Sequence, residues 1–164
     1  MKILSFDPSG NYGEKNWGTS GYCYGDSDFL PQRLKQVAAS DYDSQQAYWF
    51  AHREIIEIVF PDICVIESYR LFGHKAKEQS GSSLETAQLI GYMHMVCHEL
   101  NIPVFLQDPS TKQRHSDDIL LRTGVIEKSG RRHTYKGELT TMHMRDALRH
   151  YMYFKKYNMK KVVK

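Results

Sequence analysis

The chain has 164 residues, a length typical of one domain with a core of two or three layers. Its hydrophobic content of 41% and charged content of 25% exclude a disordered or low-complexity chain, and the net charge of +3 permits nucleic-acid binding without requiring it. No apolar run is long enough to span a membrane, and the few apolar residues before Asp7 are too short for a signal peptide. We therefore expect a soluble, cytoplasmic protein with no membrane partner.

The cysteines support the same compartment. Cys23, Cys64 and Cys97 form no CxxC motif and leave an odd count. Cys64 lies within an apolar run and Cys97 on an apolar helical stripe, which favours buried free thiols in a reducing environment.

The first part of the chain predicts strands. Residues 2–7 form a short apolar run that is closed by Pro8-Ser9-Gly10, as expected for a buried strand. Residues 18–24 predict its hairpin partner. Residues 29–39 predict a third strand, which Pro31 restricts to the edge of the sheet.

The middle of the chain predicts helices that alternate with strands. One helix is expected from Asp43, with Gln46 completing a capping box, and the next from the capping box at residues 82–85. Residues 63–67 and 103–107 predict short strands. The expected apolar stripes are Ala47, Ala51, Ile55 and Ile58 on the first helix, and Ala87, Ile90, Met93, Cys97 and Leu100 on the second.

The last part of the chain predicts helices and a basic loop. Asp108-Pro109 opens a short helical turn, and residues 117–122 predict a short helix closed by Gly124. Residues 128–137 are basic and contain glycine, which favours a loop. A final helix is expected over residues 141–157, with Met144, Ala147, Tyr151 and Phe154 buried.

This order of elements predicts an α/β fold. An antiparallel start followed by alternating strands and helices implies a mixed sheet with helices on both faces. We expect residues 1–157 to form one domain and the basic tail, residues 158–164, to fray.

Four residues carry the functional prediction: Asp7, Glu67, His143 and Asp146. The two acids end predicted strands, and the spacing of three between His143 and Asp146 places both side chains on one helical face. Acids at strand ends and a helical pair are suited to holding divalent metal ions on a rigid frame. The combination therefore predicts a metal-dependent nuclease.

Each feature also has a structural interpretation. Asp7-Pro8-Ser9-Gly10 is an ordinary turn sequence, and Glu67 could form an ion pair with Arg70 or Lys75. The pair of His143 and Asp146 could belong to a solvated face with Arg145 and Arg149. His94 and His98 have the spacing of zinc ligands, but the sequence offers no third ligand near them.

The set as a whole resembles the RNase H-like nucleases, specifically the RuvC-type Holliday junction resolvases in their phage-encoded form. The resemblance covers nearly the whole chain. It rests on Asp7, on Glu67 and on the H-x-x-D-A-L pattern at residues 143–148. The basic segment at residues 75–91 and the strand Ile102-Pro103-Val104-Phe105, followed by a lysine, are also similar.

This resemblance implies a five-stranded RNase H-like sheet and a homodimer that resolves four-way DNA junctions. It assigns Asp7, Glu67, His143 and Asp146 as catalytic metal ligands for two Mg²⁺ ions, with Mn²⁺ also supporting activity. The enzyme would be a crossover junction endodeoxyribonuclease in the cytoplasm of the host cell. One departure concerns the aromatic wedge of relatives, because Arg70 stands three residues after the strand glutamate.

The expected DNA contacts are basic residues and the aromatic residues nearest the missing wedge. They are Tyr69, Arg70, Phe72, Lys75, Lys77, Lys112, Arg131 and Arg132. Two alternatives stay open: a nuclease of the same fold that cuts RNA–DNA hybrids, flaps or terminase-type substrates, and a non-catalytic nucleic-acid-binding protein.

Overall fold

The computed structural model describes residues 1–69 and 84–162, and its centre is a mixed five-stranded sheet with the order β3-β2-β1-β4-β5. The strands are β1 (Lys2–Asp7), β2 (Thr19–Asp26), β3 (Arg33–Ala38), β4 (Ile63–Glu67) and β5 (Val104–Gln107). The β1–β2 and β2–β3 pairs are antiparallel, and β4 runs parallel to both β1 and β5. The antiparallel start and the parallel continuation are therefore confirmed.

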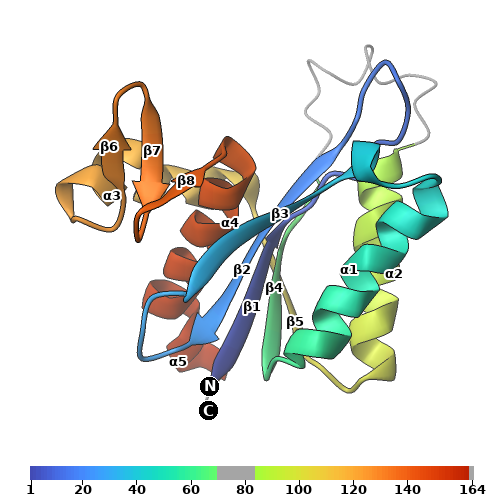
Figure 1. Ribbon diagram of the computed structural model, residues 1–164. Coiled ribbons are helices and arrows are strands. Elements are labelled where there is room, and N and C mark those ends of the chain that lie inside the picture. Colours follow the sequence, from blue (N-terminus) through green and yellow to red (C-terminus); the bar gives the residue numbers. More distant parts are fainter. Residues whose placement is uncertain (70–83, 163–164) are drawn as a thin grey trace.

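Helices cover both faces of this sheet, as the sequence predicts. Helices α1 (Gln45–Val59) and α2 (Glu85–Glu99) lie on one face, and α4 (Met142–Tyr153) crosses the other (Figure 1). Side chains of β1 alternate between the faces, because Leu4 packs with the core beneath α1 and α2 and Ile3 packs with the core beneath α4. The remaining helical segments are η1 (Ala39–Asp41), η2 (Pro109–His115), α3 (Asp117–Arg122), η3 (Phe154–Asn158) and α5 (Met159–Val162).

Helix α1 differs in detail from its prediction. Its N-cap is Ser44 rather than Asp43, and the Ser44 hydroxyl accepts the Ala47 N–H at 3.1 Å. The expected stripe is only half right, since Ala51 is buried and Ile55 packs against the core, whereas Ala47 and Ile58 are exposed. The buried residues are Tyr48, Ala51, His52, Ile56 and Val59. The polar atoms of the buried Tyr48 and His52 both contact the Ser20 hydroxyl on β2, which satisfies them inside the core.

The predicted stripe of α2 is confirmed at its centre, where Ile90, Met93 and Cys97 are buried. The first two residues of its predicted capping box, 82 and 83, lie outside the described residues. All three cysteines are free and buried, as expected. Over the described part of the chain, none of the helices combines the length and the apolar character needed to cross a membrane.

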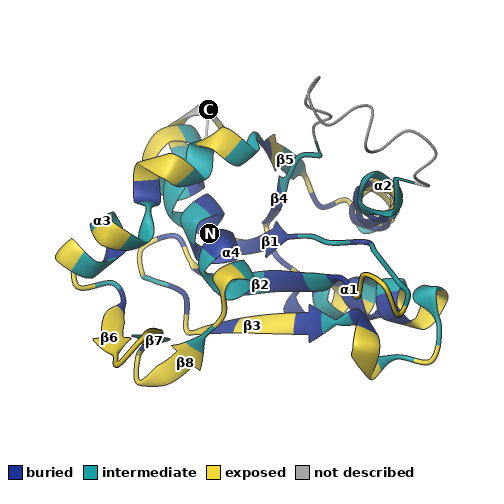
Figure 2. Cartoon of the chain, turned by 90° about the horizontal axis from the view of Figure 1, so that it is seen from above, coloured by how far each residue is buried: buried dark blue, intermediate teal, exposed yellow. Residues whose placement is uncertain are grey.

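Residues 127–140 form a small second sheet where the sequence predicts a loop. Strands β6 (Glu127–Ser129), β7 (Arg132–Tyr135) and β8 (Glu138–Thr140) pair antiparallel. The two tight turns use Gly130 and the pair Lys136-Gly137, all with positive φ. The segment lacks the alternation of apolar and polar residues that indicates a strand, because only Tyr135 in it is buried. We call β6–β8 the small sheet; it is largely exposed (Figure 2).

The end of the chain is helical further than predicted. Helix α4 passes at Tyr153 into the π-helical η3 and then into α5, so that residues 159–162 form a helix where we expect fraying. Ala147, Tyr151 and Phe154 are buried as predicted, whereas Met144 is only half-buried. The division into a domain and a tail stays a prediction.

A glycine lets α4 lie directly on the sheet. A Cβ atom at Gly21 in β2 would stand 1.9 Å from the carbonyl oxygen of His143, so only glycine fits without moving the helix. Gly21 pairs with Asp7 across β1 and β2. The Ser5 hydroxyl, on the same face, donates to the Ala147 carbonyl oxygen at 2.9 Å. The start of α4 is thereby fixed above the end of β1.

Candidate metal centre

The two strand-end acids lie side by side. Strands β1 and β4 pair in parallel with Phe6 opposite Ile66, so the next residues, Asp7 and Glu67, end neighbouring strands at the same edge. Both belong to the series of side chains that faces α4. Asp7 is only 7% exposed, and this burial gives its charge few water contacts.

Helix α4 brings the predicted pair to this edge. The His143 Nδ1 atom is 3.0 Å from Asp7 Oδ2, and Asp146 is buried one helical turn further on. The N-cap Thr141, whose hydroxyl accepts the Met144 N–H, begins the helix two residues before His143. The structure therefore brings all four predicted ligands together, although their role as ligands stays a prediction.

Lys112 occupies the middle of the acids. Its Nζ atom lies 2.8 Å from Glu67 Oε2, 2.9 Å from Asp146 Oδ2 and 3.6 Å from Asp7 Oδ1. Burial alone would lower the pKa of the Lys112 ammonium, but the three carboxylates raise it well above its ordinary value. The predicted phosphate contact of Lys112 stays a prediction, and in this structure three carboxylates surround its ammonium.

This arrangement fits a cation. Three carboxylates from β1, β4 and α4 converge on a single positive group, which is the donor set that a hard divalent ion prefers. In the described part of the chain, no group of three or more acidic, histidine or cysteine side chains is already spaced to hold an ion. The carboxylates are spaced around the Lys112 ammonium, so binding of an ion requires this side chain to move.

The neighbouring acids differ in pKa. Burial raises the pKa of Asp7, and the bond from His143 offsets this only in part. Burial would also raise the pKa of Glu67, but hydrogen bonds and charges from His150 and Lys112 outweigh it and lower the pKa. The bond to Asp7 raises the pKa of His143. Hence Glu67 is held as an anion more firmly than Asp7.

Sequence reasoning missed the roles of His150, which contacts Glu67, and of Gln107, which contacts His150. His150, which the pattern placed beyond Asp146, is fully buried, and its Nε2 atom lies 2.5 Å from Glu67 Oε2. The His150 Nδ1 atom lies 2.8 Å from Oε1 of Gln107, the β5 residue paired with Glu67. The available signals were that Gln107 is polar at a strand end and that His150 follows Asp146 at a spacing of four.

Arg149 braces Asp146 from the side, and Arg145 shares the Asp117 carboxylate with it. Arg149 donates to Asp146 Oδ1 at 2.6 Å and also contacts Asp117 at 2.7 Å. Arg145 contacts the same Asp117 oxygen at 2.9 Å. The alternative in which this face is simply solvated is therefore wrong for Arg145 and Arg149, whose side chains are 12% and 16% exposed.

The structure describes some of the other predicted DNA contacts but not all of them. Tyr69 is half-buried against the core beneath α1 and α2, whereas Arg131 and Arg132 are exposed on the small sheet. Four predicted DNA contacts lie outside the described residues: Arg70, Phe72, Lys75 and Lys77. The alternative zinc pair, His94 and His98, is exposed on α2, and no cluster of metal-ligating side chains forms there among the residues that the structure describes.

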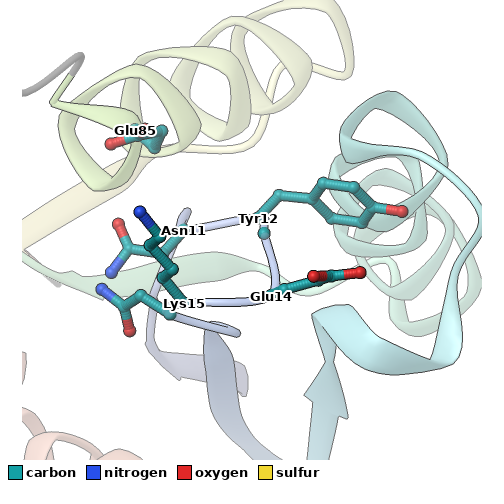
Figure 3. Close-up of a pocket in the computed structure, with 7 residues that line it drawn as sticks. Asn11, Tyr12, Glu14, Lys15 and Glu85 are labelled. Carbon is teal, nitrogen blue, oxygen red and sulfur yellow. The ribbon is translucent and has the colours of Figure 1, made fainter.

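A pocket of about 600 Å³ lies between the loop after β1 and the start of α2 (Figure 3). Its lining residues are Asn11, Tyr12, Gly13, Glu14, Lys15, Asn16 and Glu85. The Tyr12 hydroxyl donates to the Tyr42 carbonyl oxygen at 2.7 Å. None of the four predicted ligands lines this pocket, so the acids form a separate site at the sheet edge.

The fold is similar to that of solved RuvC structures. One similar structure, T. thermophilus RuvC in complex with a Holliday junction substrate, shares 14% identity over 93% of this chain and 91% of that chain, with a TM-score of 0.64. Another, a Thermus thermophilus RuvC structure, shares 13% identity over 93% and 92%, with a TM-score of 0.59. No protein-family model matches the sequence, and no curated protein sequence matches it either. At this identity the likeness shows the fold alone.

Proposed function

We propose that this protein is a divalent-metal-dependent endonuclease that resolves four-way DNA junctions. The observation that carries the proposal is the convergence of Asp7, Glu67 and Asp146 on one cation position at the edge of an RNase H-like sheet. A structural salt-bridge cluster does not need three buried acids around one lysine, because each buried carboxylate adds a desolvation cost.

The residues that would hold the metal are the three carboxylates and His143. Their oxygen-rich set suits Mg²⁺, and one imidazole nitrogen makes Mn²⁺ acceptable. When bound, a metal pair supplies an activated water and neutralises charge on the leaving 3′-oxygen of a phosphodiester. The chain's own groups orient the acids: Arg149 holds Asp146 from the side, and His143 contacts Asp7.

Lys112 can take a second role in this reaction. With a metal bound among the acids, its ammonium would be released from them, and it lies at the same edge, where a scissile phosphate would approach. The predicted contact between Lys112 and phosphate is thus compatible with its position among the carboxylates. Its side chain is 20% exposed, so it can reach the surface.

The proposed substrate rests on two supports. A similar structure holds a Holliday junction, and the small sheet, which leads directly into α4 at Thr141, presents Arg131 and Arg132 to solvent. Exposed arginines of this kind bind phosphate through charge and paired N–H donors. A homodimer would supply two active sites for paired nicks. The phage origin rests on the sequence resemblance alone.

One experiment tests the proposal. The protein is incubated with a four-way junction, a linear duplex, a flap and an RNA–DNA hybrid, each with Mg²⁺ or Mn²⁺, and Asp146→Asn serves as the inactive control. We expect symmetric nicks in the junction, none in the matched duplex, and none with the control. Preferential cleavage of the hybrid or the flap would move the protein to another RNase H-like activity. Binding without any cleavage would make it a non-catalytic binding protein.

A further inference from the structure

His150 is a fully buried histidine that the four-ligand site does not use. It lies on α4 one turn after Asp146, and its ring is enclosed between the ends of β4 and β5. The Nε2 atom contacts Glu67 Oε2 at 2.5 Å, and the Nδ1 atom contacts Gln107 Oε1 at 2.8 Å. Both ring nitrogens therefore have oxygen partners that belong to paired strands.

The direction of the hydrogen bond to Glu67 follows from the second partner of this carboxylate. Glu67 Oε2 lies 2.8 Å from the Lys112 ammonium, as expected for an ionised carboxylate. Because such a carboxylate only accepts hydrogen bonds, His150 Nε2 donates to Glu67. On the other side of the ring, His150 Nδ1 lies 2.8 Å from Gln107 Oε1 and 3.4 Å from the Thr111 hydroxyl oxygen.

The two partners of Glu67 Oε2, His150 and Lys112, differ in conformational freedom. Gln107 is 2% exposed and His150 0%, and their side chains are fixed to each other and to the strands. Lys112 reaches the same oxygen from η2 through a flexible four-carbon chain. A cation that enters among the acids can therefore replace the Lys112 ammonium, while the imidazole stays in place.

We propose that His150 is a positioning residue that fixes the Glu67 carboxylate for metal binding, with Gln107 fixing the imidazole. By holding Oε2 it sets the plane of the carboxylate relative to Asp7 and Asp146. This inference rests on the proposed function, because it concerns the same metal. Partners of this kind behind a metal ligand typically contribute 10- to 100-fold to metal affinity.

The test measures Mn²⁺ affinity without DNA, from the electron paramagnetic resonance signal of free Mn²⁺. We expect His150→Ala to weaken the affinity by roughly 10- to 100-fold, and His150→Gln, which keeps one donor, by less than tenfold. The matched control is Tyr151→Phe on the same helix, which loses bonds to the Asp26 and Phe29 carbonyl oxygens without touching the acids. Its Mn²⁺ affinity should equal that of the wild type, although its melting temperature falls.

A second readout separates positioning from a general loss of packing. Junction cleavage by His150→Ala should recover when Mn²⁺ is raised above the weakened Kd, which a damaged core would not allow. Equal affinity in wild type, His150→Ala and His150→Gln would overturn the inference, and so would tighter binding in His150→Ala. Glu67→Gln separates the two proposals. If it also leaves Mn²⁺ affinity unchanged, the metal site itself is wrong; if it alone weakens binding, only the role of His150 is wrong.

Discussion

Two buried clusters of polar side chains lie on opposite faces of the main sheet, and they differ in charge. Beneath α1, the Ser20 hydroxyl bonds to Tyr48 at 3.0 Å and to His52 at 2.9 Å, and the Tyr48 hydroxyl donates to the Ser9 carbonyl oxygen. Burial lowers the pKa of His52 to about 4, so this cluster is neutral at pH 7. Beneath α4, three carboxylates and the Lys112 ammonium form a charged cluster, and His150 contacts one of these carboxylates.

The difference supports the proposal that the charged cluster is the functional site. The neutral cluster completes its hydrogen bonds within the protein and holds the Ser9 turn after β1 in place, which is a structural role. The charged cluster needs several ion pairs to offset the burial of three acids. Because such buried charge is costly, its presence at one edge is best explained by a function that uses it.

The largest expected effect comes from neutralising the charged cluster. Asp7→Asn, Glu67→Gln and Asp146→Asn should each lower kcat for junction cleavage by about 10³-fold or more, because an amide is a poor ligand for a hard cation. DNA affinity should be kept or increased, since negative charge is removed near phosphate. Asp62→Asn, at the other end of β1, is the control, because Asp62 accepts the Lys2 N–H at 2.7 Å far from the cluster. Near-normal cleavage by one of the three variants would remove that residue from the ligand set.

The next effect comes from moving α4 against the sheet. Gly21→Ala places a Cβ atom against the His143 carbonyl oxygen, so the helix must shift and carry His143 and Asp146 with it. We expect a loss of about 1–3 kcal/mol in the free energy of unfolding and roughly 100-fold in kcat. Gly91→Ala is the matched control on α2, where an added Cβ meets nothing within 4 Å. Unchanged cleavage by Gly21→Ala would mean that the position of α4 does not control the site.

The neutral cluster should respond to acid without affecting the metal. The folded pKa of His52 is lowered from 6.5 to about 4, so the unfolded chain takes up the proton first and stability falls as pH drops from about 6.5 to 4. The difference between these two pKa values corresponds to about 3 kcal/mol in the free energy of unfolding. His52→Gln should flatten this part of the plot of unfolding free energy against pH while leaving Mn²⁺ affinity unchanged. A wild-type pH slope in His52→Gln would show that another group titrates there.

The smallest effect concerns His143 in the metal-free protein. Its folded pKa is raised by the bond to Asp7, so its stabilisation is complete below the ordinary pKa and is lost as pH rises through the raised value. The side chain is 36% exposed, so we expect less than about 1 kcal/mol. Melting temperatures of wild type and His143→Ala in EDTA at pH 6 and pH 8.5 measure this stabilisation. The difference between the two proteins should be larger at pH 6, and the reverse order would contradict the assigned partner.

Part of the fold and site could be predicted because the signals are local. Runs such as residues 63–67 predict buried strands, and acids that end parallel strands meet at one edge whatever the intervening sequence. The spacing of His143 and Asp146 likewise fixes one helical face. Predicting these features requires only the periodicity of the sequence and the order of its strands and helices.

The rest depends on tertiary contacts. Nothing local distinguishes the buried His150 from a solvated histidine, since its partners Glu67 and Gln107 are far away in sequence. Lys112 similarly reads as a surface lysine until η2 places it among the acids. The small sheet is hidden because its strands are three or four residues long and are exposed, so apolar alternation cannot reveal them.

We propose that the charged cluster is a divalent cation site that Lys112 fills in the absence of metal. The most direct test is a crystal of the protein grown with Mn²⁺, with anomalous diffraction measured at the manganese edge. We expect an anomalous peak in contact with Asp7, Glu67 and Asp146, with the Lys112 ammonium displaced and the contact between His150 and Glu67 kept. A cluster without a peak, with Lys112 still bound to the three carboxylates at saturating Mn²⁺, would contradict it.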